Sequence, residues 1–359
     1  MNILQTETLK GWGGQQNKII LESIALGELG HKVILVCNPG ARIRERAEKH
    51  GIQTFELEMN KGNYHRTIPF FLRLIRSHSI DLVITHGSTD SWIGGMAAWF
   101  SRANPRSLRE RHNLFPIRSR PSRWLHHSLF DGVLSISEAV SDYLREIGVS
   151  SERILPLPDC VDTERFRPSP TSFRQAHGIP DSAQVVGTVT SLRKQKGVWD
   201  CYQVARRVLA RTPAYFVFGG TSYPDIEGQI MDQLEQEGLD CSRVIWTGFS
   251  ERVSEIMNAL DVFVFLSHSE GLGTVLLEAM ACELPAVVYD RRPMSDLVSD
   301  GVNGHVVPFG DTEQATDRIL SLLRHPDVCC ELGRHGRRMV EDEYSYPALK
   351  RRLALITGR

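Results

Sequence analysis

The feature that most constrains this chain is an alternation of short apolar runs with longer amphipathic runs, which occurs in both halves of the sequence. The apolar runs are nearly continuous, as in LVIT at 82–85, FVFL at 263–266 and VVY at 287–289. Such runs are typical of parallel strands covered on both faces, and strands that alternate with helices predict a parallel sheet. The sequence therefore predicts an α/β chain with two tandem Rossmann-like domains.

A polar, proline-bearing stretch at 159–181 interrupts the alternation and is typical of a connection between domains. We therefore expect an N-terminal domain at 1–160 and a second domain at 161–344, and the length of 359 residues suits two domains. The last residues, 345–359, carry an apolar series that predicts a helix packing back on the first domain. That series is Leu349, Leu353, Leu355 and Ile356.

The composition excludes a general electrostatic attraction to nucleic acid, because 42 Lys and Arg residues balance 43 Asp and Glu residues. No apolar stretch reaches the ~18 residues of a membrane span, and the first residues lack the basic and apolar regions of a signal peptide. We therefore expect a cytoplasmic protein. Seven scattered cysteines without a CxxC pair indicate reduced thiols rather than disulfides or a zinc site.

Polar residues that can bind a ligand or take part in catalysis lie just after the predicted strands. Ligands of open parallel sheets bind beyond the carboxyl ends of the strands, so these positions are the most informative. They comprise GWGGQQ, THGSTD and RERHN in the first half, and SLRKQKG, FGGTS, TGFS and SHSEGLGTVLLE in the second. Their glycines, cations and two spaced glutamates predict a phosphorylated ligand.

The segment from Glu270 to Glu278 is the sharpest of these features. Glu270 follows an apolar strand, and Gly271 and Gly273 allow the backbone to approach a ligand closely. Thr274 begins a predicted helix whose first N–H groups can hold phosphate oxygens, and Glu278 lies about one turn into it. The pattern therefore predicts a ligand at this helix start.

Cations and histidines follow other strands. Arg193 and Lys196 come directly after a predicted strand and can neutralise a diphosphate, whereas Lys194 is expected to be solvated. His112 follows a predicted strand of the first domain and is a candidate catalytic residue. For His86, at another strand end, the favoured interpretation is a hydrogen bond to its own loop.

These motifs resemble those of the retaining, nucleotide-sugar-dependent glycosyltransferases of the GT-B fold, specifically family four. The resemblance is carried by GWGGQQ with ELGHKV, by LPDCVDTERFRP, by DGVNGHVVPFGD, and by the E-x7-E pair of Glu270 and Glu278. It implies two Rossmann-like domains whose parallel sheets face each other across a cleft. It also implies sugar transfer to an acceptor hydroxyl with retention of configuration, without a metal or other cofactor, from a UDP or GDP sugar.

The resemblance also implies roles for single residues. Gly13 and Gly14 would lie near the diphosphate and acceptor, and His112 would approach the donor sugar. Arg193 and Lys196 would bind the diphosphate. Glu270 would bind sugar hydroxyls and act with these three as the catalytic set, while Glu278 would bind the ribose. The remaining expected nucleotide-sugar contacts are Gly219, Gly248, Gly271, Leu272, Gly273 and Thr274.

Two departures from the family pattern stand out. Ser191 occupies the position where the family most often has arginine, which makes Arg193 a displaced candidate. The donor-sugar loop, normally rich in glycine, reads DRRPMSD here.

Other classes of protein are alternatives to a glycosyltransferase. A nicotinamide dehydrogenase is disfavoured because Gln16 stands where the G-x-G-x-x-G pattern needs a third Gly or Ala, and no acid closes the strand at Cys37. A sugar-nucleotide epimerase of the same fold and a binding-only, inactive homologue remain alternatives.

The acceptor is indicated only by a basic segment. Seven arginines and one acid, Glu110, give residues 102–123 a formal charge of +6, and apolar side chains lie between the arginines. This mixture suits an anionic membrane surface or a lipid-linked, phosphorylated acceptor, although a solvated loop can also hold it. We therefore expect an enzyme of bacterial cell-surface glycan assembly, of lipopolysaccharide or polysaccharide, at the cytoplasmic leaflet. The arginines are Arg102, Arg106, Arg109, Arg111, Arg118, Arg120 and Arg123, and the apolar residues are Leu114, Phe115, Ile117, Trp124 and Leu125.

Overall fold

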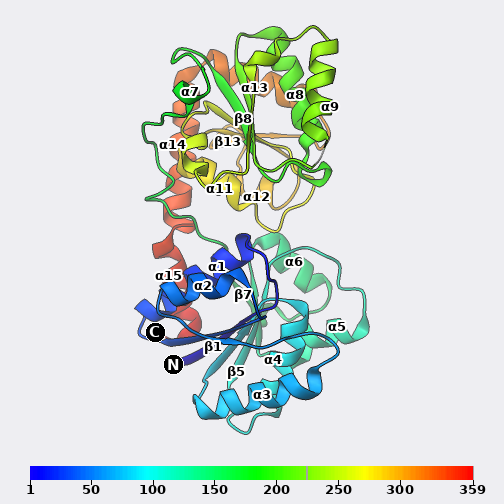
Figure 1. The fold of residues 1–359 in the computed structure, drawn as a ribbon, viewed down its shortest axis with the longest axis vertical. Helices are drawn as coiled ribbons and strands as arrows, with labels where there is room; N and C mark the ends of the chain where they lie inside the picture. Colours follow the sequence, from blue (N-terminus) through cyan, green and yellow to red (C-terminus); the bar gives the residue numbers. More distant parts are fainter. Residues whose placement is uncertain (224, 359) are drawn as a thin grey trace. The chain divides into compact units, whose positions relative to one another are not determined.

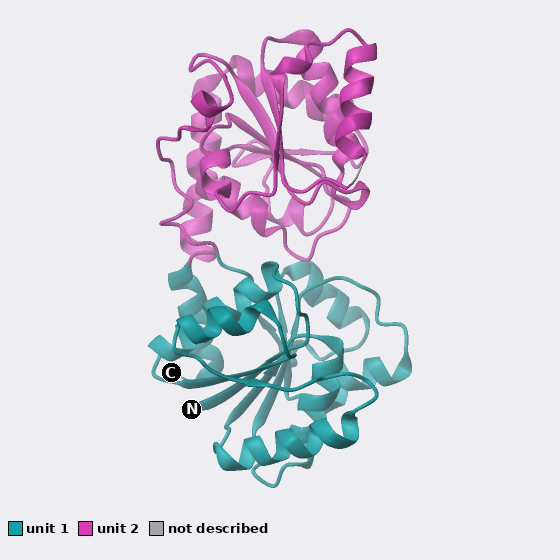
Figure 2. Ribbon diagram, in the orientation of Figure 1, with its two compact units in different colours: residues 1–160, 346–359 teal, residues 161–345 magenta. Residues whose placement is uncertain are grey.

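The computed structural model describes residues 1–223 and 225–358 of the chain. The chain forms two compact units (Figure 2). Unit 1 contains residues 1–160 and 346–359, and unit 2 contains residues 161–345. Each unit is a parallel sheet between helices, so the predicted α/β class with two Rossmann-like domains is confirmed.

The sheet of unit 1 has seven parallel strands in the order β3-β2-β1-β4-β5-β6-β7. Figure 1 shows this sheet and labels its strands β1, β5 and β7. The order reverses between β1 and β4, and ligands of such sheets bind beyond the strand ends at this switch point. The strands are β1 (Asn2–Glu7), β2 (Lys32–Cys37), β3 (Gln53–Glu56), β4 (Leu82–Thr85), β5 (Arg106–Arg111), β6 (Gly132–Ser135) and β7 (Ile154–Pro156).

Helices cover both faces of this sheet. One core lies under α1 and α15 and includes Ile3 and Leu108, while the other lies under α3 and α4 and includes Leu4 and Val83. Alternate residues of each strand therefore face opposite helix layers. The helices are α1 (Gly14–Glu28), α2 (Arg42–Lys49), α3 (Tyr64–Ser77), α4 (Ser88–Phe100), α5 (Arg120–Trp124), the π-helical turn η1 (Leu125–Leu129), α6 (Glu138–Glu146), the 3-10 turn η2 (Ser151–Arg153) and α15 (Tyr346–Thr357).

The last helix, α15, belongs to unit 1 although it follows unit 2 in the sequence. Leu349, Leu353 and Ile356 lie one helical turn apart on one face and are buried against α1. Leu355 was expected to join them, but its side chain is 80% exposed because it points away from that face. The backbone oxygen of Ile356 accepts a hydrogen bond of 2.6 Å from Arg106 on β5.

The sheet of unit 2 has six parallel strands in the order β10-β9-β8-β11-β12-β13, with its switch point between β8 and β11. The strands are β8 (Val185–Val189), β9 (Tyr215–Gly219), β10 (Val244–Gly248), β11 (Val262–Phe265), β12 (Ala286–Tyr289) and β13 (Gly304–Val307). The helical elements are α7 (Phe173–Ala176), η3 (Lys194–Lys196), α8 (Val198–Arg211), α9 (Ile226–Gln236), η4 (Cys241–Arg243), α10 (Val253–Met257), α11 (Thr274–Ala281), α12 (Met294–Leu297), α13 (Thr312–Arg324) and α14 (Pro326–Glu343).

Among the helices of at least eight residues, α2, α13 and α14 have no counterpart in the sequence expectations. Each shows only a narrow buried face, such as Ile43 and Ala47 on α2, between many charged residues. All seven cysteines are free thiols, and Cys330 is the exposed one. Among the described residues, no helix combines the length and the apolar character that crossing a membrane requires.

Candidate functional site

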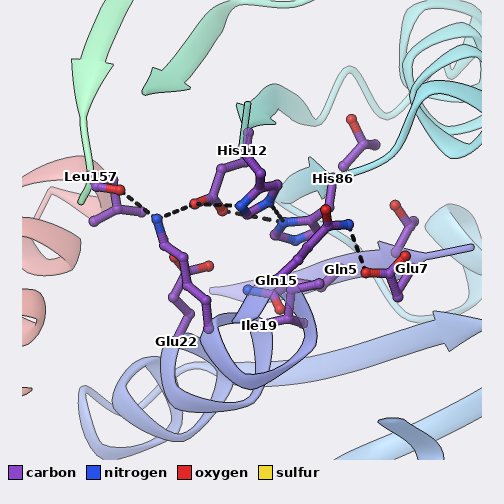
Figure 3. Close-up of polar contacts among 12 residues, drawn as sticks. Gln5, Glu7, Gln15, Ile19, Glu22, His86, His112 and Leu157 are labelled. Carbon is purple, nitrogen blue, oxygen red and sulfur yellow. Dashed lines mark hydrogen bonds and ion pairs between the residues drawn. The ribbon is translucent and has the colours of Figure 1, made fainter. Parts of the chain in front are cut away.

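Unit 1 carries a buried polar cluster at the carboxyl end of its sheet. Strand alternation directs Glu110 of β5 toward the layer of α1, together with His86 after β4 and His112 after β5. In Figure 3 His86 and His112 lie beside each other, and Gln15 and Glu22 approach from α1. The rings of His86 and His112 stack with centroids 5.3 Å apart.

Lys18 of α1 holds this cluster together. Its ammonium contacts the Glu110 carboxylate, lies 3.4 Å from Asp159 and 3.6 Å from Glu22, and donates a 2.5 Å hydrogen bond to the backbone oxygen of Leu157. Lys18 is 2% exposed, and Glu22 and Glu110 are fully buried. Buried charges are stable only when they are paired, so these residues form one interdependent unit.

Burial and pairing set the protonation of the cluster. Burial alone lowers the pKa of Lys18, but the neighbouring carboxyls outweigh it and raise the pKa above its ordinary value. Burial raises the pKa of Glu22 well above its usual range, which favours its protonated form. For Glu110 burial acts in the same sense, but Lys18 and the two histidines hold its pKa below the usual range. An ionised Glu110 therefore pairs with a charged Lys18.

His112 is neutral, because burial lowers its pKa to about 3. Nδ1 of His86 lies 3.2 Å from the Glu110 carboxylate and 3.1 Å from Nε2 of His112. An ionised carboxylate only accepts hydrogen bonds, so we assign the ring hydrogen of His86 to Nδ1, which lies near Glu110 and donates to Nε2 of His112. His112 accepts at Nε2 and holds its own hydrogen on Nδ1. His86 thus contacts Glu110 and His112 and not only its own loop.

The same three residues meet the distance requirement for a metal site. Their potential ligand atoms lie within 4.8 Å of one another. However, the Lys18 ammonium already contacts the Glu110 carboxylate. A cation there would have to compete with that ammonium, so the donor set favours a hydrogen-bonding role for His112.

The glycine-rich loop of unit 1 is tied to the same edge. Gly13 is the exposed N-cap of α1 and Gly14 its first residue, and neither has backbone or bulky side chains close to the position of a Cβ. Glu7 at the end of β1 accepts hydrogen bonds of 2.7 Å from Gln15 and 2.9 Å from Gln16. This pair of bonds fixes the start of α1 beside the histidines.

The basic segment of unit 1 is not one surface, which corrects the expectation from the sequence. Arg118, Arg120 and Arg123 are exposed, but Arg109 is only 4% and Arg111 only 7% exposed. Both lie on the face of β5 opposite Glu110, where they line a cavity of about 340 Å³. Because β5 is a central strand, α4 and the loop after β5 cover these side chains.

Unit 2 places its predicted residues at the switch point between β8 and β11. Nζ of Lys196 lies 2.7 Å from Glu270 and 3.4 Å from the backbone oxygen of Ser269. The side chain of Lys196 is 27% exposed. Arg193 is exposed and lies over the Tyr223 ring, 4.9 Å from its centroid, and Lys194 is exposed as expected. The structure thus brings Lys196 and Glu270 together.

Glu278 lies in α11 and lines a separate cavity of about 280 Å³. The cavity is bordered by Thr190 after β8, Thr221 after β9 and Phe249 after β10, all at the same edge of the sheet. Burial raises the pKa of Glu278 to about 7, with Arg165 acting weakly in the opposite sense. A hydrogen-bond donor entering this cavity would meet a carboxyl that titrates near neutrality.

The predicted glycines of unit 2 have different roles. Gly273 is the N-cap of α11 with a φ of +92°, and Thr274 is the first residue of the helix. Gly271 and Leu272 precede them, and Leu272 is buried. Gly219 and Gly248 end their strands. Gly220, which is not among the predicted site residues, is more strongly required to be glycine than Gly219 or Gly248. Its φ is +117°, and a Cβ there would meet the Thr190 backbone at 1.9 Å.

Sequence reasoning also missed Lys18, Glu22 and Glu110 as site residues. The sequence does contain a signal for them. All three are charged residues at positions where the helix and strand patterns predict a buried side chain. In unit 2 it missed the pair of His268 and Asp200, whose side chains lie 2.6 Å apart beside the end of β11.

Comparisons with known proteins agree with this geometry. The family model described as Glycosyltransferase Family 4 matches residues 12–165, and the model described as Glycosyl transferases group 1 matches residues 170–339. The chain is a family-four, group 1 glycosyltransferase of the GT-B fold. The two matches fall on the two compact units, so each unit corresponds to one half of the family's enzyme.

Individual relatives of this glycosyltransferase span most of its length. A protein of Bacillus subtilis named "Putative glycosyltransferase EpsD" is 27% identical over 286 residues, which is 74% of this chain and 73% of that protein. A crystal structure of HepE from Anabaena in complex with UDP has a TM-score of 0.87 at 18% identity and covers all of both chains. The structure of WaaG, a glycosyltransferase involved in lipopolysaccharide biosynthesis, has a TM-score of 0.72 at 15% identity over the full length of both chains. At these identities the two structures establish the shared fold.

Proposed function

We propose that this glycosyltransferase moves a sugar from a nucleoside diphosphate sugar, with UDP or GDP as the nucleotide, to an acceptor hydroxyl with retention of configuration and without a metal. The observation that carries the proposal is the pairing of Lys196 with Glu270 at the switch point of unit 2. The HepE structure with bound UDP supports a uridine nucleotide. Unit 2 is the proposed donor domain, and unit 1 the proposed acceptor domain.

The leaving diphosphate is stabilised by positive charge in this proposal. Lys196 and Arg193 neutralise its oxygens, and the amides at Gly273 and Thr274 add the positive end of the α11 dipole. An ammonium has three N–H groups, so Lys196 can hold Glu270 and a phosphate oxygen at once. It thereby places the sugar-binding carboxylate at a fixed distance from the bond that breaks.

The nucleoside occupies the cavity of Glu278 in the same proposal. Its ribose hydroxyls donate to the Glu278 carboxylate, and residues near Gly219 and Gly248 border the base. His112, neutral and held by His86, approaches the donor sugar as a hydrogen-bond donor through Nδ1. As the diphosphate leaves, positive charge develops on the sugar, the acceptor hydroxyl attacks from the same face, and its proton passes to the departing diphosphate.

Product analysis tests this function. The full chain is incubated with UDP- and GDP-sugars, and an acceptor mixture is screened for transfer in the presence of EDTA. The expected product keeps the anomeric configuration of the donor, as judged by the coupling constant of its anomeric proton. Interconversion of the nucleotide sugars without transfer would support an epimerase instead, and tight binding without either reaction would indicate an inactive homologue.

A role at the membrane in cell-surface glycan assembly is a second part of the proposal. It is supported by an aromatic face of unit 1, in which Trp99 and Phe100 are 59% and 60% exposed and Trp124 packs 5.5 Å from Trp99. Arg120 and Arg123 lie on the same short helix as Trp124. Aromatic and basic side chains together suit an anionic lipid surface, where each basic residue contributes ~1 kcal/mol. Absence of sedimentation with anionic vesicles at low salt would refute this contact.

A further inference from the structure

The cavity beside β5 in unit 1, which we name the arginine pocket, is lined by residues that the reaction described above does not use. It lies on the face of β5 opposite Glu110, and its volume is about 340 Å³. Arg109 and Arg111 of β5, Ser88 and Trp92 of α4, and His126 of η1 form much of its lining. Pockets of at least ~300 Å³ with a few convergent polar groups are typical ligand sites.

The two arginines are buried without acidic partners. Among residues 1–223 and 225–358, neither guanidinium forms an ion pair, and Nε of each lacks a hydrogen-bond partner. Arg111 donates to the backbone oxygen of Phe115, while no protein acceptor contacts the Arg109 side chain within the described chain. Buried charges in proteins are normally paired, so two unpaired guanidinium groups facing one cavity indicate an anion that belongs there.

The remaining lining is neutral or donates hydrogen bonds. Burial lowers the pKa of Arg109 to about 10, and Arg111 acts in the same sense, so both remain charged at neutral pH. Burial also lowers the pKa of His126 to about 3, and Nδ1 of this neutral ring donates a 2.7 Å hydrogen bond to the backbone oxygen of Ser122. Its buried Nε2, which has no partner within the described chain, is therefore an acceptor that can receive a hydrogen bond from a phosphate hydroxyl. Asp90, the acid that acts on the pKa of Arg109, has a smaller effect than burial and Arg111, and it accepts a 2.6 Å hydrogen bond from Thr6.

We propose that the arginine pocket binds a phosphate group of the sugar acceptor. This inference rests on the proposed transferase function and names the class of its acceptor. Two guanidinium groups match a phosphate dianion in charge, and each can form paired N–H···O bonds to its oxygens. Arg111 directly precedes His112 in the chain, so an acceptor anchored here lies at the same strand end as that histidine.

Calorimetric titration of the full chain with inorganic phosphate tests the pocket. Saturating UDP is present throughout, so that the proposed diphosphate site of unit 2 is filled. We expect one phosphate site in the parent protein and a loss of about tenfold or more in affinity in Arg109→Met and in Arg111→Met. Arg73→Met, at an exposed arginine of α3 outside the pocket, is the matched control and should bind as the parent does.

The outcomes separate this inference from the proposed function. If UDP binds but phosphate does not, or if Arg109→Met binds phosphate like the parent, the arginine pocket is not a phosphate site. If UDP fails to bind, the proposed donor site is wrong, while the phosphate titration still reports on unit 1. UDP affinity should be the same in all three variants.

The melting temperature without ligand provides a second measurement. Arg109→Met removes an unpaired buried charge and keeps a side chain of similar length, so we expect the unliganded protein to melt about 2 to 4 °C higher. A lower melting temperature would show that Arg109 stabilises the fold, and that result would count against a binding role.

Competition experiments distinguish the source of the phosphate. Displacement of phosphate by glucose 1-phosphate would support a soluble phosphorylated acceptor. Stronger binding to phosphatidic acid vesicles than to phosphatidylserine vesicles, lost in Arg109→Met, would support a lipid-linked one. Absence of both effects would overturn the proposal, and so would equal displacement by glucuronic acid, which carries a carboxylate in place of the phosphate.

Discussion

The two units share one topology but treat the charges at their strand ends in opposite ways. In unit 1 the side chains of Lys18 and Glu110 are at most 2% exposed and are locked together behind α1. In unit 2 Arg193 and Lys194 are exposed, and Lys196, whose side chain is 27% exposed, pairs with Glu270. The sheet topology therefore determines where the polar side chains lie. The helix that follows the first strand determines whether these side chains are exposed to solvent.

This difference matches the two tasks in the proposed reaction. A neutral histidine is presented best by a rigid, dry network, because its tautomer and orientation are then fixed before substrate arrives. A diphosphate must enter and leave at every turnover, so its cations need access to solvent. The following predictions test whether unit 1 depends on its polar residues for stability and unit 2 for activity.

The largest effect is expected from Lys18→Met in unit 1. The substitution leaves the fully buried Glu110 carboxylate without its cation, which typically costs about 3–5 kcal/mol of unfolding free energy. Urea denaturation measures the loss, and Lys32→Met, an exposed lysine of β2, should change it by less than about 0.5 kcal/mol. The added substitution Glu110→Gln should restore part of the loss. If Lys18→Met were as stable as the parent, unit 1 would not depend on its buried polar residues for stability, and the proposed difference between the units would be wrong.

Lys196→Ala in unit 2 should act on turnover instead. Loss of one preorganised donor to a developing anion reduces kcat by about 10² to 10³, whereas loss of a solvated lysine has little effect. Lys194→Ala is the matched control, because it lies in the same 3-10 turn and is exposed. Both variants should unfold like the parent. Equal rates for the two would contradict the assignment of Lys196.

A smaller effect is expected from the pH dependence at Glu278. Its pKa of about 7 means that the carboxyl is mostly protonated below pH 7, and ribose hydroxyls donate more strongly to the ionised form. UDP binding should therefore weaken by about tenfold as the pH falls from 8 to 6. Calorimetry on Glu278→Gln should show a flatter profile, which also corrects for protonation of UDP itself. Parallel profiles for parent and variant would place the ribose elsewhere.

Much of the fold was predictable because its signals are local. Each of these signals depends on residues that are close together in the sequence. Examples are the strand runs at 82–85 and 263–266, the glycines near 271–273 and the periodic apolar face of 346–357. The class of the two domains followed from these signals. Of the site, the neighbourhood of Lys196 and Glu270 was accessible for the same reason, because both follow strands at the centre of one sheet.

The sequence by itself thus determined two parallel α/β units and the segments that supply their strand-end residues. Only the tertiary structure decided that Lys18 pairs with Glu110, 92 positions away in the chain, and that Arg109 and Arg111 line a pocket rather than the outer surface. The physical reason is that the residues next to a charged residue in the sequence do not show whether its side chain is buried. Whether it is solvated or buried depends on which helix and loop are packed over its strand, and that packing joins residues far apart in sequence.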